Sequence, residues 1–117
     1  MSASDGFLRL AKEQLADVGP VTVRRMFGGA GLYANGLMFG LVADDTLYFK
    51  ADDETRDLFE AEGLEPFVYD GKGKPVRMSY WRAPDRVFDD RDAMTTWAKA
   101  AIGAARRAAS RKRPRRR

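Results

Sequence analysis

The sequence of 117 residues contains neither cysteine nor histidine. Without cysteine there is no disulfide framework, and without either residue there is no thiolate or imidazole to serve as nucleophile, general base or metal ligand. The chain also lacks an apolar run near the roughly 20 residues that a membrane helix needs, and it shows no secretory signal. These absences predict a cytoplasmic protein with no membrane role and a chemistry limited to carboxylates, lysines, tyrosines and arginines.

The carboxylates that remain for acid–base chemistry occur in pairs at predicted turns and helix starts. The pairs are Asp44-Asp45, Asp52-Asp53 and Asp89-Asp90. Local hydrogen bonds to the backbone explain acids at such places. A lone Lys50 or Arg25 could hold an anion, but a solvated charge on a strand is the favoured interpretation. We therefore assign no catalytic residue, no metal ligand and no cofactor, and expect a protein that is not an enzyme.

Positive charge is concentrated at the C-terminal end. The last twelve residues hold eight of the 21 bases and no acid, so residues 1–105 hold the other 13 bases and all 17 acids. Clustered bases that release counterions from phosphates give salt-sensitive binding to DNA or RNA without base selectivity. The predicted nucleic-acid-binding residues are Arg106, Arg107, Arg111, Lys112, Arg113, Arg115, Arg116 and Arg117. Added solubility or unspecific attraction, and binding to an acidic lipid surface, stay open as alternatives.

Hydrophobic periodicity predicts an α+β fold with three helices. Apolar residues recur at helical spacing over 4–18, after the acids at 52–54, and from about 90 to 109. Alternating or β-branched runs over 21–26, 37–43, 46–50, 66–70 and 76–82 predict strands, and a further strand is expected directly after the glycine-rich run 27–31. The expected architecture is an antiparallel sheet of five to six strands with an N-terminal, a middle and a C-terminal helix, in the order α-β(3-4)-α-β(2)-α. We place one domain over 1–109 and a disordered basic tail over 110–117. The apolar stripe of the last helix is Met94, Trp97, Ala98, Ala101, Ile102 and Ala105.

The glycine-rich run 27–31 has two interpretations. Gly29 to Ala34 fits the dinucleotide-binding pattern, which requires a helix directly after the glycines. Asn35-Gly36 follows instead, and this pair is a strong signal for a β-hairpin. We therefore predict a strand after the glycines, and a bulge or tight corner where the backbone passes close to another element. A ligand or partner that touches this bare backbone stays open.

Alternation along the last strand places Trp81 on one face with Arg77 and Ser79, and we expect this face to be partly exposed. A cross-strand aromatic pair with Tyr69 or Tyr48 is the favoured role for Trp81. Stacking of the indole on a nucleic-acid base or on a partner is the alternative.

Several of these segments together resemble the N-terminal domain of the TfoX/Sxy family, regulators of bacterial competence. The resemblance covers roughly residues 5–107, and it rests on the runs 24–33, 47–50, 63–69, 78–80 and 97–98. It implies a secretion-chaperone-like α+β architecture and supplies no catalytic residue. The residues of the family motif are Arg25, Met26, Phe27, Gly28, Gly29, Gly31 and Tyr33.

The resemblance also bears on function. Full-length competence regulators carry a second, helical domain assigned to transcription, whereas this chain ends in a basic tail. We therefore expect a non-enzymatic regulatory or accessory protein in transcription regulation, with nucleic acid contacted through the tail. The alternative is a protein-interaction module, a homodimer or a complex with another protein, that has no nucleic-acid role.

Overall fold

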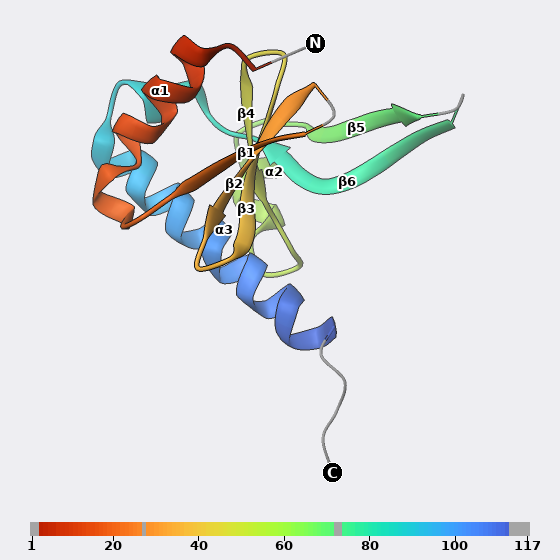
Figure 1. Cartoon of the computed structure of the whole chain (residues 1–117). Helices are drawn as coiled ribbons and strands as arrows, with labels where there is room; N and C mark the ends of the chain where they lie inside the picture. The colour runs from red at the N-terminus through yellow and green to blue at the C-terminus, as the bar shows by residue number, and fades with distance from the viewer. Residues whose placement is uncertain (1–2, 27, 72–73, 113–117) are drawn as a thin grey trace.

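A computed structural model describes residues 3–26, 28–71 and 74–112, and it shows a six-stranded antiparallel sheet with helices against it (Figure 1). The α+β class and the order helix, four strands, helix, two strands, helix are confirmed. The elements are α1 (Asp5–Gln14), the 3-10 turn η1 (Ala16–Val18), β1 (Thr22–Met26), β2 (Gly29–Ala34), β3 (Leu37–Ala43), β4 (Thr46–Lys50), α2 (Arg56–Ala61), β5 (Pro66–Gly71), β6 (Lys74–Arg82), the 3-10 turn η2 (Asp85–Phe88) and α3 (Arg91–Lys112).

The strand order is β1-β2-β3-β4-β6-β5, so the first four strands pair in sequence order. Asn35 and Gly36, which join β2 to β3, have φ values of 53° and 79°. Asp44 and Asp45, which join β3 to β4, have φ values of 56° and 49°. Positive φ at both central residues gives a hairpin turn whose twist matches that of the strands. The meander that the Asn-Gly signal predicted is therefore present.

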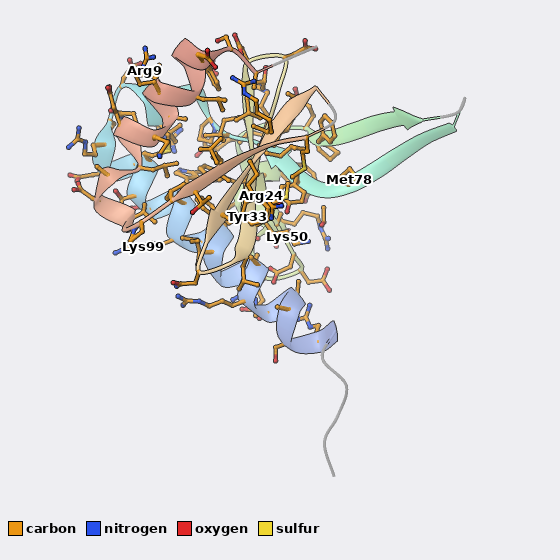
Figure 2. All side chains as sticks on the ribbon, viewed as in Figure 1. Arg9, Arg24, Tyr33, Lys50, Met78 and Lys99 are labelled. Carbon is orange, nitrogen blue, oxygen red and sulfur yellow. The ribbon has the colours of Figure 1, made fainter. Side chains whose placement is uncertain are left out.

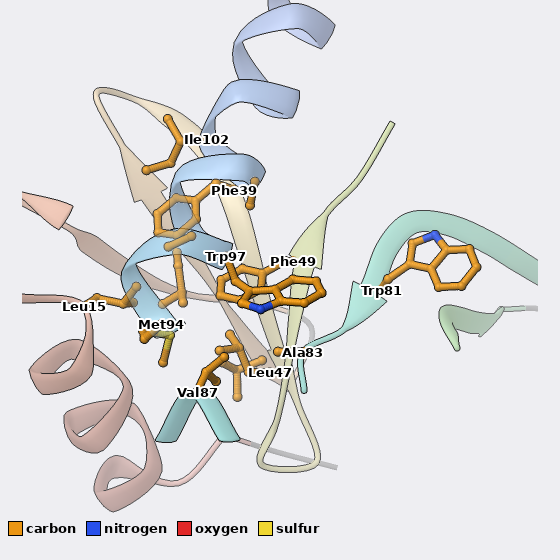
Figure 3. Close-up of a cluster of buried hydrophobic side chains, with 14 of the residues drawn as sticks. Leu15, Phe39, Leu47, Phe49, Trp81, Ala83, Val87, Met94, Trp97 and Ile102 are labelled. Atoms are coloured by element: carbon orange, nitrogen blue, oxygen red, sulfur yellow. The ribbon is translucent and has the colours of Figure 1, made fainter. Parts of the chain in front are cut away.

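The helices lie on one face of the sheet, where they enclose the core. Figure 3 shows Met94 and Trp97 of α3 beside Phe39 and Phe49 of the sheet. All six residues of the predicted α3 stripe are buried. From α2, the Phe59 ring packs 5.0 Å from the Trp97 ring, so this short helix lies on the same side as α3. The sheet and helices thus form two layers.

The prediction that Trp81 lies on a partly exposed face is wrong. Trp81 is only 6% exposed, and its ring lies 6.0 Å from the Phe59 ring. β6 pairs with β4 so that Trp81 is opposite the core residue Phe49. Alternation correctly separates Trp81 from Tyr80, but the neighbouring strand decides which of the two faces the helices.

The middle helix differs from prediction at its first residue, and the last helix differs at its last residue. α2 begins at Arg56, because residues 52–55 form a hydrogen-bonded turn before it. The end of α2 has the form of a Schellman motif: Gly63 has a φ of 71°, and the Leu64 amide donates to the Phe59 carbonyl at 3.1 Å. α3 continues to Lys112, three residues beyond the predicted end, since bases near a helix C-terminus are favoured by the helix dipole.

The glycine-rich run 27–31 leads from β1 into β2. Its first residue, Phe27, lies outside the described residues. Gly28 has a φ of 79°, which favours glycine. At Gly29 a Cβ atom would lie 2.2 Å from the Val42 carbonyl oxygen of β3. The predicted close backbone approach is confirmed, and the glycines open a strand rather than a helix.

Candidate functional site

The basic residues of the C-terminal segment have different surroundings. The last turns of α3 extend past the sheet (Figure 1), and the Arg106 and Arg111 side chains on them are exposed. Arg107 instead contacts the body of the domain. Lys112 ends the helix. The other predicted nucleic-acid-binding residues, Arg113, Arg115, Arg116 and Arg117, lie outside the described residues.

Arg107 fastens α3 to the turn before α2. Its Nε donates to Asp52 Oδ2 at 2.6 Å, and its second terminal nitrogen donates to Asp52 Oδ1 at 3.1 Å. Glu54 adds an oxygen 3.3 Å from Nε. The Asp52 side chain is 9% exposed, and the hydrogen bonds from Arg107 hold its pKa below the usual value. Because Arg107 is bound by these carboxylates, it contributes little positive charge to a ligand.

Asp52→Asn is expected to lower the free energy of unfolding by about 2 kcal/mol at pH 7, since it removes charge-assisted hydrogen bonds at a buried carboxylate. Folding lowers the pKa of Asp52, so its contribution is present above the unfolded carboxyl pKa of about 3.9 and is lost as pH falls through the folded value. Urea unfolding of both proteins between pH 7 and pH 3 measures this dependence. The difference between the two stabilities should narrow toward pH 3.

The matched control is Asp53→Asn. The Asp53 side chain is 84% exposed and pairs with the half-exposed Arg56. Exposed pairs of this kind contribute about 0.5 kcal/mol or less. An equal loss in the two variants, or a loss at Asp52 that persists unchanged to pH 3, would contradict the assigned role of Asp52.

A second cluster of side chains lies on the face of the sheet opposite the helices. Residues directly opposite each other on paired strands share a face, and one such row runs across five strands through Arg24, Gly31, Leu41, Tyr48 and Arg82. We call this side the outer face. The described side chains on it include Arg24, Met26, Tyr33, Met38, Leu41, Tyr48, Lys50, Tyr80 and Arg82.

Two cations of the outer face lie over aromatic rings. The Arg24 guanidinium is 5.5 Å from the centre of the Tyr33 ring, and Lys50 Nζ is 5.3 Å from the centre of the Tyr80 ring. Both distances suit a cation–π interaction. Lys50 also donates to the Ser79 hydroxyl at 2.6 Å. Figure 2 shows Arg24, Tyr33 and Lys50 on the sheet, whereas Arg9 and Lys99 project from the helices.

Tyr80 is a buried residue of the outer face. Its hydroxyl donates to the Met38 carbonyl at 3.2 Å. Burial raises the pKa of Tyr80 to about 12, so the ring stays neutral at physiological pH. Sequence reasoning missed this cluster, although alternation along β4 alone places Tyr48 and Lys50 on the same face.

Two residues of the family motif, Gly31 and Arg25, make close contacts within the fold. Gly31 lies beneath three side chains of the outer face: a Cβ there would be 3.0 Å from Met26 Cε and Tyr33 Cε1, and 3.1 Å from Met38 Sδ. Arg25 points the other way. It forms an ion pair with Asp5 and donates to the Ala3 carbonyl at 2.7 Å, which anchors the N-terminal segment to β1.

Asp45 and Asp90, two of the paired acids, accept hydrogen bonds from backbone amides, but only the bond to Asp90 is local, because the donor to Asp45 lies 41 positions away in the sequence. Asp45 Oδ1 accepts from the Ser4 amide at 2.7 Å, and Asp90 Oδ1 accepts from the Ala93 amide at 3.2 Å at the start of α3. Across residues 3–26, 28–71 and 74–112, no group of three or more acids could hold a metal ion. No helix in this described part is long and apolar enough to cross a membrane.

Comparison with known proteins agrees with the resemblance seen in the sequence. The chain is 36% identical over 64 residues to DNA transformation protein TfoX1 of Aliivibrio fischeri. Those residues are 55% of this chain and 31% of the relative, so the chain matches less than a third of that protein. A family model for the TfoX N-terminal domain matches residues 13–105, which include all six strands and most of α3. The chain therefore belongs to the TfoX N-terminal domain family.

Proposed function

We propose that this chain is a cytoplasmic, non-enzymatic regulatory or accessory protein of the competence type, and that it contacts the phosphate backbone of nucleic acid through the basic end of α3 and the residues that follow. The observation that carries the proposal is the exposure of Arg106 and Arg111 on helical turns beyond the sheet. The relative's printed name, a DNA transformation protein, supports it.

Charge separation within the chain favours this binding mode. Residues 1–105 hold 13 bases and 17 acids, so this part of the chain carries a net negative charge. Seven bases remain beyond residue 105 once Arg107 is assigned to its ion pair with Asp52. A polyanion is therefore drawn to one end of the molecule, where contacts to phosphates neutralise charge without reading bases.

The test is a pair of double variants on the same helix. Arg106→Gln with Arg111→Gln should weaken binding of a fluorescein-labelled 20-base-pair duplex about tenfold at 0.1 M salt, because two phosphate contacts are lost. Arg91→Gln with Lys99→Gln removes the same charge from exposed positions nearer the start of α3 and should change affinity little. Fluorescence anisotropy measures both affinities.

Equal effects in the two double variants would show that net charge alone matters and would contradict a localised site. Absence of duplex binding by the unmodified chain at low salt would refute the proposal outright.

A protein-interaction module is the second candidate function. It is favoured by Val68 and Met78 on the β5–β6 hairpin, which are 49% and 36% exposed. Light scattering of nuclease-treated protein distinguishes the two functions. A dimer that persists at high salt would favour the protein-interaction module, whereas a monomer is expected if the chain acts on nucleic acid.

A further inference from the structure

We propose that the outer face of the sheet is a second, separate binding surface, and that it takes an unpaired nucleic-acid strand whose bases stack on tyrosine rings while Arg24 and Lys50 meet its phosphates. This goes beyond the proposed function, which concerns backbone contacts at the end of α3 and makes no distinction between single and double strands.

The first argument is the sign of the charge. No Asp or Glu occurs in β1, β2, β3, β4 or β6, whereas α1, α2, α3 and the connecting segments carry nearly all of the acids. Among the side chains that the structure describes, the charged ones of the outer face are Arg24, Lys50 and Arg82. Arg82 pairs with Glu65 at 2.9 Å and with Asp85 at 3.5 Å, and Arg24 and Lys50 lie over the Tyr33 and Tyr80 rings. This face is therefore complementary to an anionic partner.

The second argument concerns the aromatic side chains of the outer face and Phe67 on the edge strand β5, which contacts Tyr48. Tyr33, Tyr48 and Phe67 are half-buried, so each ring keeps accessible surface. The Tyr48 and Phe67 rings meet edge to face with centres 4.9 Å apart. Rings held by packing on a sheet, with an arginine plane beside them, offer the stacking surface that unpaired bases use in many nucleic-acid-binding sheets.

A second copy of this chain is a poorer occupant. A two-fold interface places the same patch on both subunits, so Arg24 and Lys50 of one copy would meet the cations of the other. β1, β2, β3, β4 and β6 contain no acid that could offset that repulsion, and Glu65 and Asp85 are already paired with Arg82. A duplex is also a poorer occupant, because its bases are already stacked inside the helix.

The experiment compares two probes on the full chain: a fluorescein-labelled 15-residue oligothymidylate and a 15-base-pair duplex. Tyr33→Leu keeps an apolar side chain over Gly31 but removes the ring, and should weaken binding of the single strand about tenfold while leaving the duplex unchanged. Tyr33→Phe retains the ring and should bind as the unmodified chain does. Arg24→Gln should weaken binding of the single strand severalfold, whereas Arg9→Gln on the exposed side of α1 should not.

The outcomes separate this inference from the proposed function. Arg106→Gln with Arg111→Gln should weaken both probes equally, because phosphate contacts do not sense strandedness. The inference is overturned if Tyr33→Leu affects both probes equally or neither, or if poly-glutamate displaces the single strand as well as unlabelled oligothymidylate does. Equal melting temperatures for Tyr33→Leu and Tyr33→Phe confirm that a lost affinity reflects the missing ring.

Discussion

Gly29→Ala is expected to lower the free energy of unfolding by about 3 kcal/mol and the melting temperature by roughly 10 °C. The added Cβ would lie 2.2 Å from the Val42 carbonyl oxygen, and both groups belong to hydrogen-bonded strands. Neither can move without breaking pairs between β2 and β3. Urea unfolding followed by circular dichroism measures the loss.

Gly6→Ala is the matched control for this substitution. Gly6 lies in α1, and a Cβ there would meet nothing within 4 Å. Alanine is the better helix former, so this variant should be about 0.5 kcal/mol more stable than the unmodified chain. A Gly29 variant that loses less than about 1 kcal/mol would show that the backbone approach is not tight in solution.

The second large effect is the salt dependence of duplex binding. Seven bases beyond residue 105 are not engaged by Asp52, and if each neutralises one phosphate, log affinity should fall against log salt with a slope of about −6. Affinity would then drop by about 10³ or more between 50 and 200 mM salt. Anisotropy titrations at four salt concentrations give the slope.

Replacing four of these bases tests whether each of the seven neutralises one phosphate. A chain with Arg113→Gln, Arg115→Gln, Arg116→Gln and Arg117→Gln keeps three bases and should show a slope of about −3. Arg107→Gln should leave the slope unchanged, because its guanidinium is already neutralised by Asp52 and Glu54. A slope that is insensitive to the fourfold substitution would place the phosphate contacts elsewhere on the protein.

The sequence predicted those parts of the fold that depend on neighbouring residues. Asn35-Gly36 defines a turn through its own backbone preferences, and Gly63, a glycine just beyond the last turn, ends α2 in the same local way. Such signals act over a few residues and need no knowledge of the rest of the chain.

Features that depend on distant partners were not predictable in this way. The face occupied by Trp81 follows from pairing of β6 with β4, whose residue Phe49 is far away in sequence. The ion pair of Arg107 joins residues 55 positions apart. The outer face also needs the register shift between Leu32 and Tyr33, which no local pattern indicates. Of the candidate sites, the basic segment was visible in the sequence and the sheet face was not.

The strand order also has a kinetic consequence. Each connection within β1-β2-β3-β4 is a short hairpin turn, whereas β4 reaches β6 only after α2 and β5. Because closing a short loop costs less entropy than closing a long one, the four-strand meander is the part of the sheet that the chain can assemble most rapidly. Pairing of Lys50 with Tyr80 comes from the slow, long-range step. A newly made chain would therefore carry the Arg24–Tyr33 half of the outer face before it acquires the Lys50–Tyr80 half.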